Sequence, residues 1–148
     1  MPDIRPPIEV LPHRPTHLWL DRVTLLEPDQ AVCEWTPGPE HFDGHFPDMP
    51  ILPGVKQVES AAQLGAFLLL HDDAGDTLPI FGGIERVQFL NPVVPGSRRD
   101  LFVKMLDRTK RDFRGEISAS VGDNMTMEGS ITGKIIPTRL FRRMQNLK

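Results

Sequence analysis

Histidine and glutamate side chains can exchange protons with a substrate near neutral pH, and the sequence places one of each in an unusual setting. His45 lies in a proline-rich loop, and its imidazole can serve as a base because the ordinary pKa of histidine is about 6.5. Glu59 falls on the apolar face of a predicted helix, where burial would raise the pKa of a carboxyl group and suit it to a general acid. A partly exposed glutamate stabilised by the helix dipole is the alternative interpretation of Glu59.

Gly54 stands where the loop ends and the helix begins, directly after Pro53. The first N–H groups of a helix have no acceptor within it and lie at the positive end of the helix dipole. The amide of Gly54 can therefore donate to an oxygen that gains negative charge, and the missing side chain lets that oxygen approach closely. Taken alone, the pair Pro53-Gly54 is also what an ordinary helix start requires.

The elements around these residues predict an α+β architecture. Residues 55–71 contain no proline and carry apolar side chains at steps of three and four, which predicts one long, buried helix. Its expected core face consists of Val55, Val58, Ala62, Ala66 and Leu69. Segments rich in β-branched and aromatic residues predict strands at 22–26, 30–35, 80–90, 99–108, 111–121 and 124–136. Turn chemistry predicts hairpins near 109–111 and 121–125, and the proline-rich regions before residue 20 and at 37–53 are expected to be extended or turning.

Composition limits the class of protein. The 148 residues are 39% hydrophobic and 25% charged, which predicts one globular domain over residues 1–148 with a basic tail from about residue 137. That tail could be solvated or could form a patch for an acidic protein. The net charge of −3 argues against nucleic acid as the main partner, and the longest apolar run is too short for a membrane span. Residues 1–12 lack the pattern of a secretory signal, so we expect cytoplasmic residence.

Metal sites and nucleophilic catalysis find no support in the sequence. Cys33 is single, so neither an intrachain disulfide nor a cysteine-based metal site can form. His41 and His45 are four residues apart, but Gly44 and the flanking prolines argue against the helix that would align them on a metal. No serine lies in a Gly-x-Ser-x-Gly turn, and no phosphate-binding loop occurs.

Four stretches carry motifs that belong together. Residues 44–55 read Gly-His-Phe-Pro-Asp-Met-Pro-Ile-Leu-Pro-Gly-Val, and residues 58–63 read Val-Glu-Ser-Ala-Ala-Gln. Residues 11–23 hold Leu-Pro-His-Arg and Asp-Arg-Val, and residues 83–96 hold a strand and a Pro-Val-Val-Pro-Gly turn. Over roughly residues 9–136 the chain resembles the β-hydroxyacyl-acyl-carrier-protein dehydratases of bacterial fatty acid synthesis.

The resemblance implies the hotdog fold, in which a curved antiparallel sheet wraps one central helix. It also implies a homodimer, or a trimer of dimers, whose active sites combine residues of two subunits. His45 would take a proton from C2 of a (3R)-3-hydroxyacyl thioester, Glu59 of the partner subunit would assist departure of the C3 hydroxyl, and the Gly54 amide would polarise the thioester carbonyl. The trans-2-enoyl product forms on acyl carrier protein, and no cofactor is required. The further substrate-binding residues implied are Phe46, Pro53, Val55, Gln63 and Phe89.

The chain departs from the family pattern at several positions. Leu90-Asn91 stand where relatives often have basic residues, which weakens the expected patch for an acidic carrier protein. His17 stands where an aromatic residue is common, and Lys56-Gln57 replace a more apolar pair. These changes indicate an altered acyl tunnel or a specialised lipid or polyketide pathway. Arginines that could replace the missing patch are Arg86, Arg98, Arg99 and those near the carboxyl terminus.

Three other functions remain open at this stage. A hotdog thioesterase would use a similar helix start with a carboxylate, although the Gly-His-Phe-Pro loop speaks against it. A dehydratase that also isomerises the product usually carries aspartate at the position of Glu59. A noncatalytic acyl-binding subunit would have no need to retain both His45 and Glu59.

Overall fold

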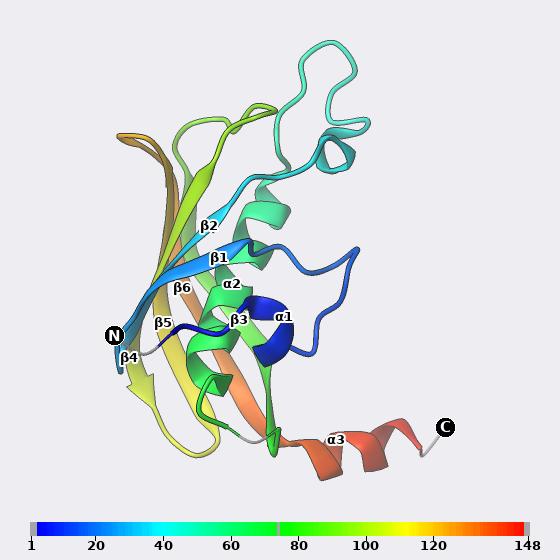
Figure 1. Ribbon diagram of the computed structural model, residues 1–148, viewed down its shortest axis with the longest axis vertical. Helices are drawn as coiled ribbons and strands as arrows, with labels where there is room; N and C mark the ends of the chain where they lie inside the picture. Colours follow the sequence, from blue (N-terminus) through cyan, green and yellow to red (C-terminus); the bar gives the residue numbers. More distant parts are fainter. Residues whose placement is uncertain (1–2, 74, 147–148) are drawn as a thin grey trace.

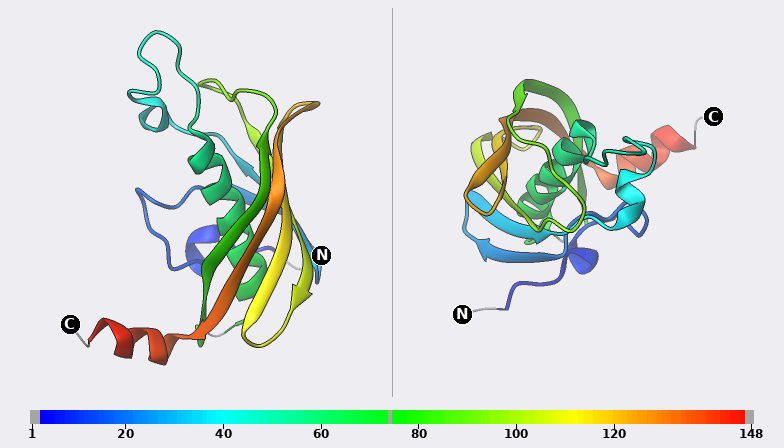
Figure 2. Two further views of the ribbon diagram at one scale, coloured as in Figure 1. Left: turned by 180° about the vertical axis from the view of Figure 1, so that it is seen from behind. Right: turned by 90° about the horizontal axis from the view of Figure 1, so that it is seen from above.

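An antiparallel sheet wraps around one long helix in the computed structural model, which describes residues 3–73 and 75–146 (Figure 1). In chain order the elements are α1 (Pro7–Val10), β1 (Arg22–Leu26), β2 (Gln30–Trp35), the 3-10 helix η1 (Pro39–Phe42), α2 (Gly54–Leu70), β3 (Thr77–Phe89), β4 (Arg99–Arg108), β5 (Asp112–Val121), β6 (Asn124–Pro137) and α3 (Thr138–Gln145). The described strands form one sheet in the order β1-β2-β4-β5-β6-β3. The view from above in Figure 2 shows the sheet curling around α2, so the predicted α+β hotdog architecture is confirmed.

The two predicted hairpins of the second half are present. Between β4 and β5, the amide of Thr109 donates to the Asp112 carbonyl at 2.9 Å, and the Thr109 hydroxyl accepts from the amides of Arg111 and Asp112. Between β5 and β6, Val121 pairs with Asn124, and Gly122 takes a φ of 57°. Positive φ costs glycine little, which explains its place in this tight turn.

Strand β3 forms one edge of the sheet and is longer than predicted. Residues 77–81 pair with β6 although Pro79 lies among them. Proline cannot donate to a sheet, but an edge strand has one side without a neighbour and tolerates it. The sequence pattern therefore placed the start of this strand too late.

Helix α2 buries a broader set of residues than predicted. Ala61, Leu64, Phe67 and Leu68 are buried, as are the polar side chains of Gln57, Ser60 and Gln63. Of the predicted core stripe, Val58 and Leu69 are buried and Ala62 and Ala66 are partly covered, but the prediction is wrong for Val55, which is 77% exposed. Since the helix is apolar on nearly every side, its periodicity could not tell which face the chain itself covers.

The proline-rich regions contain two short helices, so the prediction that they lack regular structure is wrong there. Pro7 opens α1 and Pro39 opens η1. Proline is favoured in the first turn because its fixed φ suits a helix and no amide is needed there. These helices end before the loop that carries His45.

The predicted basic tail is helical over Thr138–Gln145. Figures 1 and 2 show α3 extending away from the sheet, and none of its residues is buried. Leu140 and Met144 are exposed beside Arg139, Arg142 and Arg143. Among the described residues, no helix is both long enough and apolar enough to cross a membrane.

Candidate active site

The loop after η1 holds His45 in one orientation. The His45 amide donates to the Phe42 carbonyl at 3.0 Å, and the Ile51 amide donates to the His45 carbonyl at 2.8 Å. The imidazole Nδ1 lies 2.9 Å from the Ile51 carbonyl oxygen. Because a carbonyl can only accept, Nδ1 carries the hydrogen and Nε2 of the neutral ring keeps its lone pair. His45 is therefore prepared to act as a base through Nε2.

Helix α2 begins at Gly54 without a side-chain cap, next to the same loop. A Cβ placed on Gly54 would lie 2.7 Å from Cζ of Phe89, so only glycine lets this aromatic ring rest against the helix start. His45, Gly54, Val55 and Phe89 line one hollow. Pro53 precedes the helix and accepts from the amides of its first turn, and the side chain of Phe46 stacks on His45 with ring centroids 4.3 Å apart.

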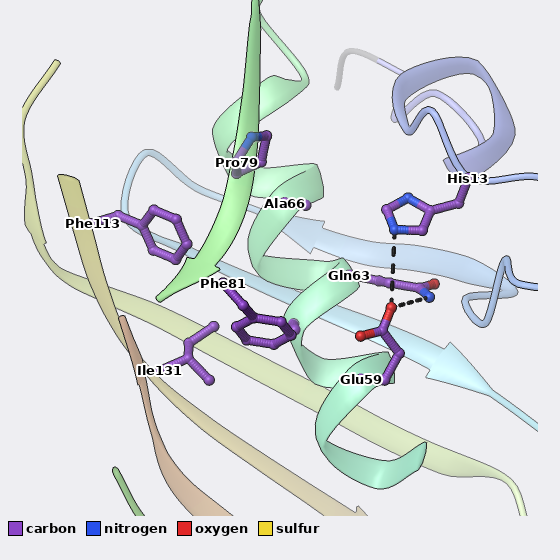
Figure 3. Close-up of a pocket in the computed structure, with 9 residues that line it drawn as sticks. His13, Glu59, Gln63, Ala66, Pro79, Phe81, Phe113 and Ile131 are labelled. Carbon is purple, nitrogen blue, oxygen red and sulfur yellow. Dashed lines mark hydrogen bonds and ion pairs between the residues drawn. The ribbon is translucent and has the colours of Figure 1, made fainter. Parts of the chain in front are cut away.

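Glu59 lies one turn further along α2, in a second group of polar residues (Figure 3). Its Oε1 accepts from Nε2 of Gln63 at 3.0 Å and lies 3.1 Å from Nε2 of His17. Nε2 of His13 is 4.0 Å from the same oxygen. The Glu59 side chain is 25% exposed, so it is sheltered but reachable.

Gln63 links this group of polar residues to the amino-terminal loop. Its Oε1 accepts from the Trp19 amide at 2.8 Å, and its Nε2 donates to the His17 carbonyl at 2.9 Å as well as to Glu59. The side chain is buried. Because protein groups engage both ends of its amide, Gln63 fixes the loop at residues 17–19 against the carboxylate.

The side chain of His13 adds an uncompensated polar atom. Burial lowers its pKa, an effect that Glu59 opposes and His17 slightly reinforces. Its Nδ1 is buried and has no hydrogen-bond partner. His13 therefore favours the neutral form near neutral pH.

A hollow adjoins Glu59, with His13 and Gln63 on its polar side and apolar side chains on the other (Figure 3). About 70 Å³ of this hollow is accessible to a water-sized molecule, and the rest opens to solvent. Small side chains on α2 leave this room, and larger ones from the sheet close it. The apolar residues that line it are Ala62, Ala66, Pro79, Phe81, Phe113 and Ile131.

The structure divides the predicted site residues between two places. His45, Gly54, Val55 and Phe89 share one hollow, whereas Glu59 and Gln63 line the other. Neither His13 nor His17 was among the site residues predicted from the sequence. The signals were the position of His13 in the amino-terminal motif and the unusual identity of His17, and neither indicated a contact with Glu59.

Arg99 occupies an unexpected position beneath α2. It is 0% exposed, its Nη1 donates to the Ser60 hydroxyl at 2.6 Å, and its guanidinium lies 5.5 Å from the Trp35 ring centroid. Burial lowers the pKa of Arg99 to about 9. The suggestion that Arg99 helps to bind a carrier protein is therefore wrong, because its charge is hidden, while Arg86 and Arg98 are exposed.

No group of three or more histidine, cysteine, aspartate or glutamate side chains within residues 3–73 and 75–146 is arranged to hold a metal ion. The buried His41 packs edge-on against Trp19 and Trp35, and burial together with Lys56 lowers its pKa.

Comparisons with known proteins place this geometry among dehydratases. Residues 27–128 match the family model described as ApeI dehydratase, ApeI-like. The 3-hydroxyacyl-[acyl-carrier-protein] dehydratase FabZ of Koribacter versatilis is 38% identical over 136 residues, covering 87% of this chain and 86% of that protein. FabZ of Natranaerobius thermophilus is 37% identical over 142 residues, with 92% and 99% covered.

A solved structure extends the likeness to the whole fold. The dehydratase heterocomplex ApeI:P from Xenorhabdus doucetiae contains a chain that matches with a TM-score of 0.79 at 18% identity. The match covers 95% of this chain and 97% of that one. At this identity the likeness concerns the fold.

Proposed function

Because the chain belongs to the ApeI-like dehydratase family, we propose that it dehydrates (3R)-3-hydroxyacyl thioesters on acyl carrier protein to trans-2-enoyl thioesters. The family predicted from the sequence motifs is thereby confirmed. One observation carries the assignment of roles within the site. The Ile51 carbonyl holds Nδ1 of His45, which leaves Nε2 free beside the uncapped start of α2.

His45 and Gly54 act together in the first half of the proposed reaction. A proton α to a thioester is a weak acid, so its removal needs a positioned base and stabilisation of the enolate-like oxygen. Nε2 of His45 takes the proton from C2. The Gly54 amide, at the positive end of α2, donates to the thioester oxygen as its charge grows.

Glu59 completes the reaction by protonating the hydroxyl that leaves C3. Nε2 of Gln63 donates to Oε1 and so fixes the carboxyl group that presents this proton. The C3–O bond breaks as this proton arrives, and water departs. Gln63 serves as a positioning residue in this scheme, and Phe46, Pro53, Val55 and Phe89 contact the substrate.

We propose that the reacting groups come from two subunits of a homodimer. His45 and Glu59 line different hollows of one chain, and exposed apolar side chains gather near β3 and the start of α2. The exposed apolar residues in this region include Phe46, Val55, Phe81, Ile84 and Phe89. Among residues 3–73 and 75–146, no strand pairs with the outer edge of β3, and a free edge with an apolar surface is suited to pairing. Further assembly into a trimer of dimers is a separate question for solution mass measurements.

The acyl chain, the carrier and the cellular location are also proposals. The apolar hollow beside Glu59 would hold the part of the chain beyond C3. The exposed Arg86 and Arg98 would attract an acidic carrier protein. Cytoplasmic residence suits an enzyme of this kind, and cell fractionation of the full chain tests it.

One assay tests the proposed function directly. The chain is incubated with 3-hydroxyacyl-carrier protein, and enoyl absorbance, free thiol and cis-3 product are measured in parallel. Dehydration produces enoyl absorbance without thiol release. Thiol release alone would indicate a thioesterase, and cis-3 product would add isomerisation.

Substitutions then test the two reacting groups. We expect His45→Ala and Glu59→Gln each to lower dehydration and the reverse hydration by at least about 100-fold, since each removes a proton-transfer group. The assembly should be preserved, as size-exclusion chromatography can check. Glu116→Gln, on the exposed outer side of β5, is the matched control. Wild-type-like rates in either active-site variant would contradict the assigned roles.

A further inference from the structure

No step of the proposed dehydration uses the contact between His17 and Glu59. Nε2 of His17 lies 3.1 Å from Oε1 of Glu59, while the His17 side chain is 60% exposed and Glu59 only 25%. His17 thus contacts the sheltered carboxylate on one side and solvent on the other. Its ring packs on Trp19 with centroids 4.5 Å apart, and Gln63 binds its carbonyl.

Each catalytic cycle leaves Glu59 without the proton that it gave to the departing hydroxyl. Water has limited access to the carboxylate, and its neighbours Gln63 and His13 cannot easily replace the proton. The Gln63 amide does not ionise. A titratable group that touches both Glu59 and solvent would remove this delay.

We propose that His17 returns a proton to Glu59 after each turnover, an inference that rests on the proposed dehydratase function. The His17 imidazolium releases its Nε2 proton to Oε1 of the Glu59 carboxylate, which yields neutral imidazole and a carboxylic acid. Nε2 of His17 then takes a proton from water or a buffer acid, which can reach the ring because the side chain is 60% exposed. His45 releases the C2 proton to solvent, so the cycle consumes and produces no net proton.

His17 suits this task better than the other histidines near it. His13 lies further from Glu59, at 4.0 Å, and burial lowers its pKa, which disfavours the charged form that a donor needs. His41 is buried and packs against Trp19 and Trp35, and its pKa is lowered by burial, by Lys56 and by His17. His17 combines direct contact with access to water.

Two substitutions separate proton return from mere positioning. His17→Phe keeps a ring against Trp19 but removes the polar edge, and His17→Gln keeps an N–H donor that cannot ionise. For both variants we expect the single-turnover rate, which starts from protonated Glu59, to stay within about twofold of the wild type. Steady-state kcat should fall about tenfold or more, because every later cycle waits for the proton.

Small acids give a second readout. Imidazole in the buffer should raise the steady-state rate of His17→Phe several-fold, in proportion to its protonated concentration, and should leave the wild type unchanged. His71→Phe, at the far end of α2, is the matched control and should behave as the wild type in both assays. Circular dichroism and chromatography check folding and assembly. If His17→Phe fails to fold, His17→Gln carries the test.

Three results would overturn the inference. Equal losses in single-turnover and steady-state rates would mean that His17 only positions Glu59. Full steady-state activity in His17→Gln would mean that a hydrogen bond to Glu59 is enough and that no proton passes from His17. An unchanged rate in both variants would mean that His17 has no role in turnover. A wild-type protein that forms no enoyl product would instead contradict the proposed function.

Discussion

Gln63 makes Glu59 one part of a hydrogen-bonded unit. The same buried amide contacts the carboxylate, the His17 carbonyl and the Trp19 amide, so the helix and the amino-terminal loop cannot shift independently. The proton-donor role proposed for Glu59 needs such fixed partners, because small displacements weaken proton transfer. The orientation of Glu59 therefore depends on a residue that need not touch the substrate.

Gln63→Leu tests this dependence with a side chain of similar size. The substitution leaves the buried Trp19 amide without its acceptor, and an unsatisfied buried donor costs about 1–3 kcal/mol. We expect the free energy of unfolding in urea to fall by that amount and kcat to fall about tenfold, because Glu59 loses a donor. Gln145→Leu on the exposed α3 is the control. Native stability together with native kcat would show that Gln63 has no positioning role.

Arg99 presents the opposite case, a charge buried without an acidic partner. None of the ion pairs found among the described residues involves it, and its Nε has no hydrogen-bond partner. Removal from water opposes its charge, as the lowered pKa of about 9 indicates. The Ser60 hydroxyl and the Trp35 ring compensate in part.

Arg99→Met should therefore stabilise the protein. Methionine fills most of the same space without a charge, and replacement of buried ionic groups by apolar ones can add about 1–2 kcal/mol. Ser60 keeps its bond to the Gln57 carbonyl at 2.8 Å. Urea unfolding of the variant measures the change. Arg99→Ala, which leaves a cavity, should instead lose stability. A loss in both variants would mean that the charge itself supports the fold.

At the scale of elements, the sequence predicted the bounds of the strands better than the residues that α2 and β4 bury. Both β1 and β2 have the predicted bounds, because their alternation and the turn between them are local signals. Alternation along β4 also points Arg99 inward with Leu101 and Val103, but its charge argued for exposure. The exposed Val55 of α2 was predicted to be core, since one sequence cannot tell a surface covered by its own chain from one left open. The contact of His17 with Glu59, 42 residues away, depends on tertiary structure and had no sequence signal.

The small side chains of Ala62 and Ala66 on α2 give the hollow beside Glu59 its size. Ala66 lines that hollow, where a larger side chain would occupy the space proposed for the acyl chain. We expect Ala66→Leu to lower kcat/KM for long 3-hydroxyacyl substrates by about tenfold or more, relative to short ones. A chain-length series on carrier protein measures the ratio. Ala66→Ser, which adds little volume, should keep the wild-type profile. Equal losses at every length would place the acyl chain elsewhere.

At the scale of the whole molecule, a single chain places His45 and Glu59 in different hollows and leaves the apolar edge at β3 exposed. The free side of β3, the exposed Ile84 and the exposed Val55 lie in the region where a second sheet edge would be added. Pairing of two such edges would cover apolar surface and unpaired backbone groups together. The proposed shared site requires the same pairing. A variant that cannot pair along β3 should therefore also be inactive.

Coexpression of two inactive chains tests the shared site. His45→Ala and Glu59→Gln chains form mixed dimers in which one site combines both substitutions and the other combines an intact His45 with an intact Glu59. With random pairing, about half of the dimers are mixed, so activity should return to about one quarter of the wild-type value. Differently tagged chains and tandem purification establish that mixed dimers are present, and each variant expressed alone is the control. Inactive mixed dimers would contradict a site shared between subunits, because a site built within one chain cannot be restored by its partner.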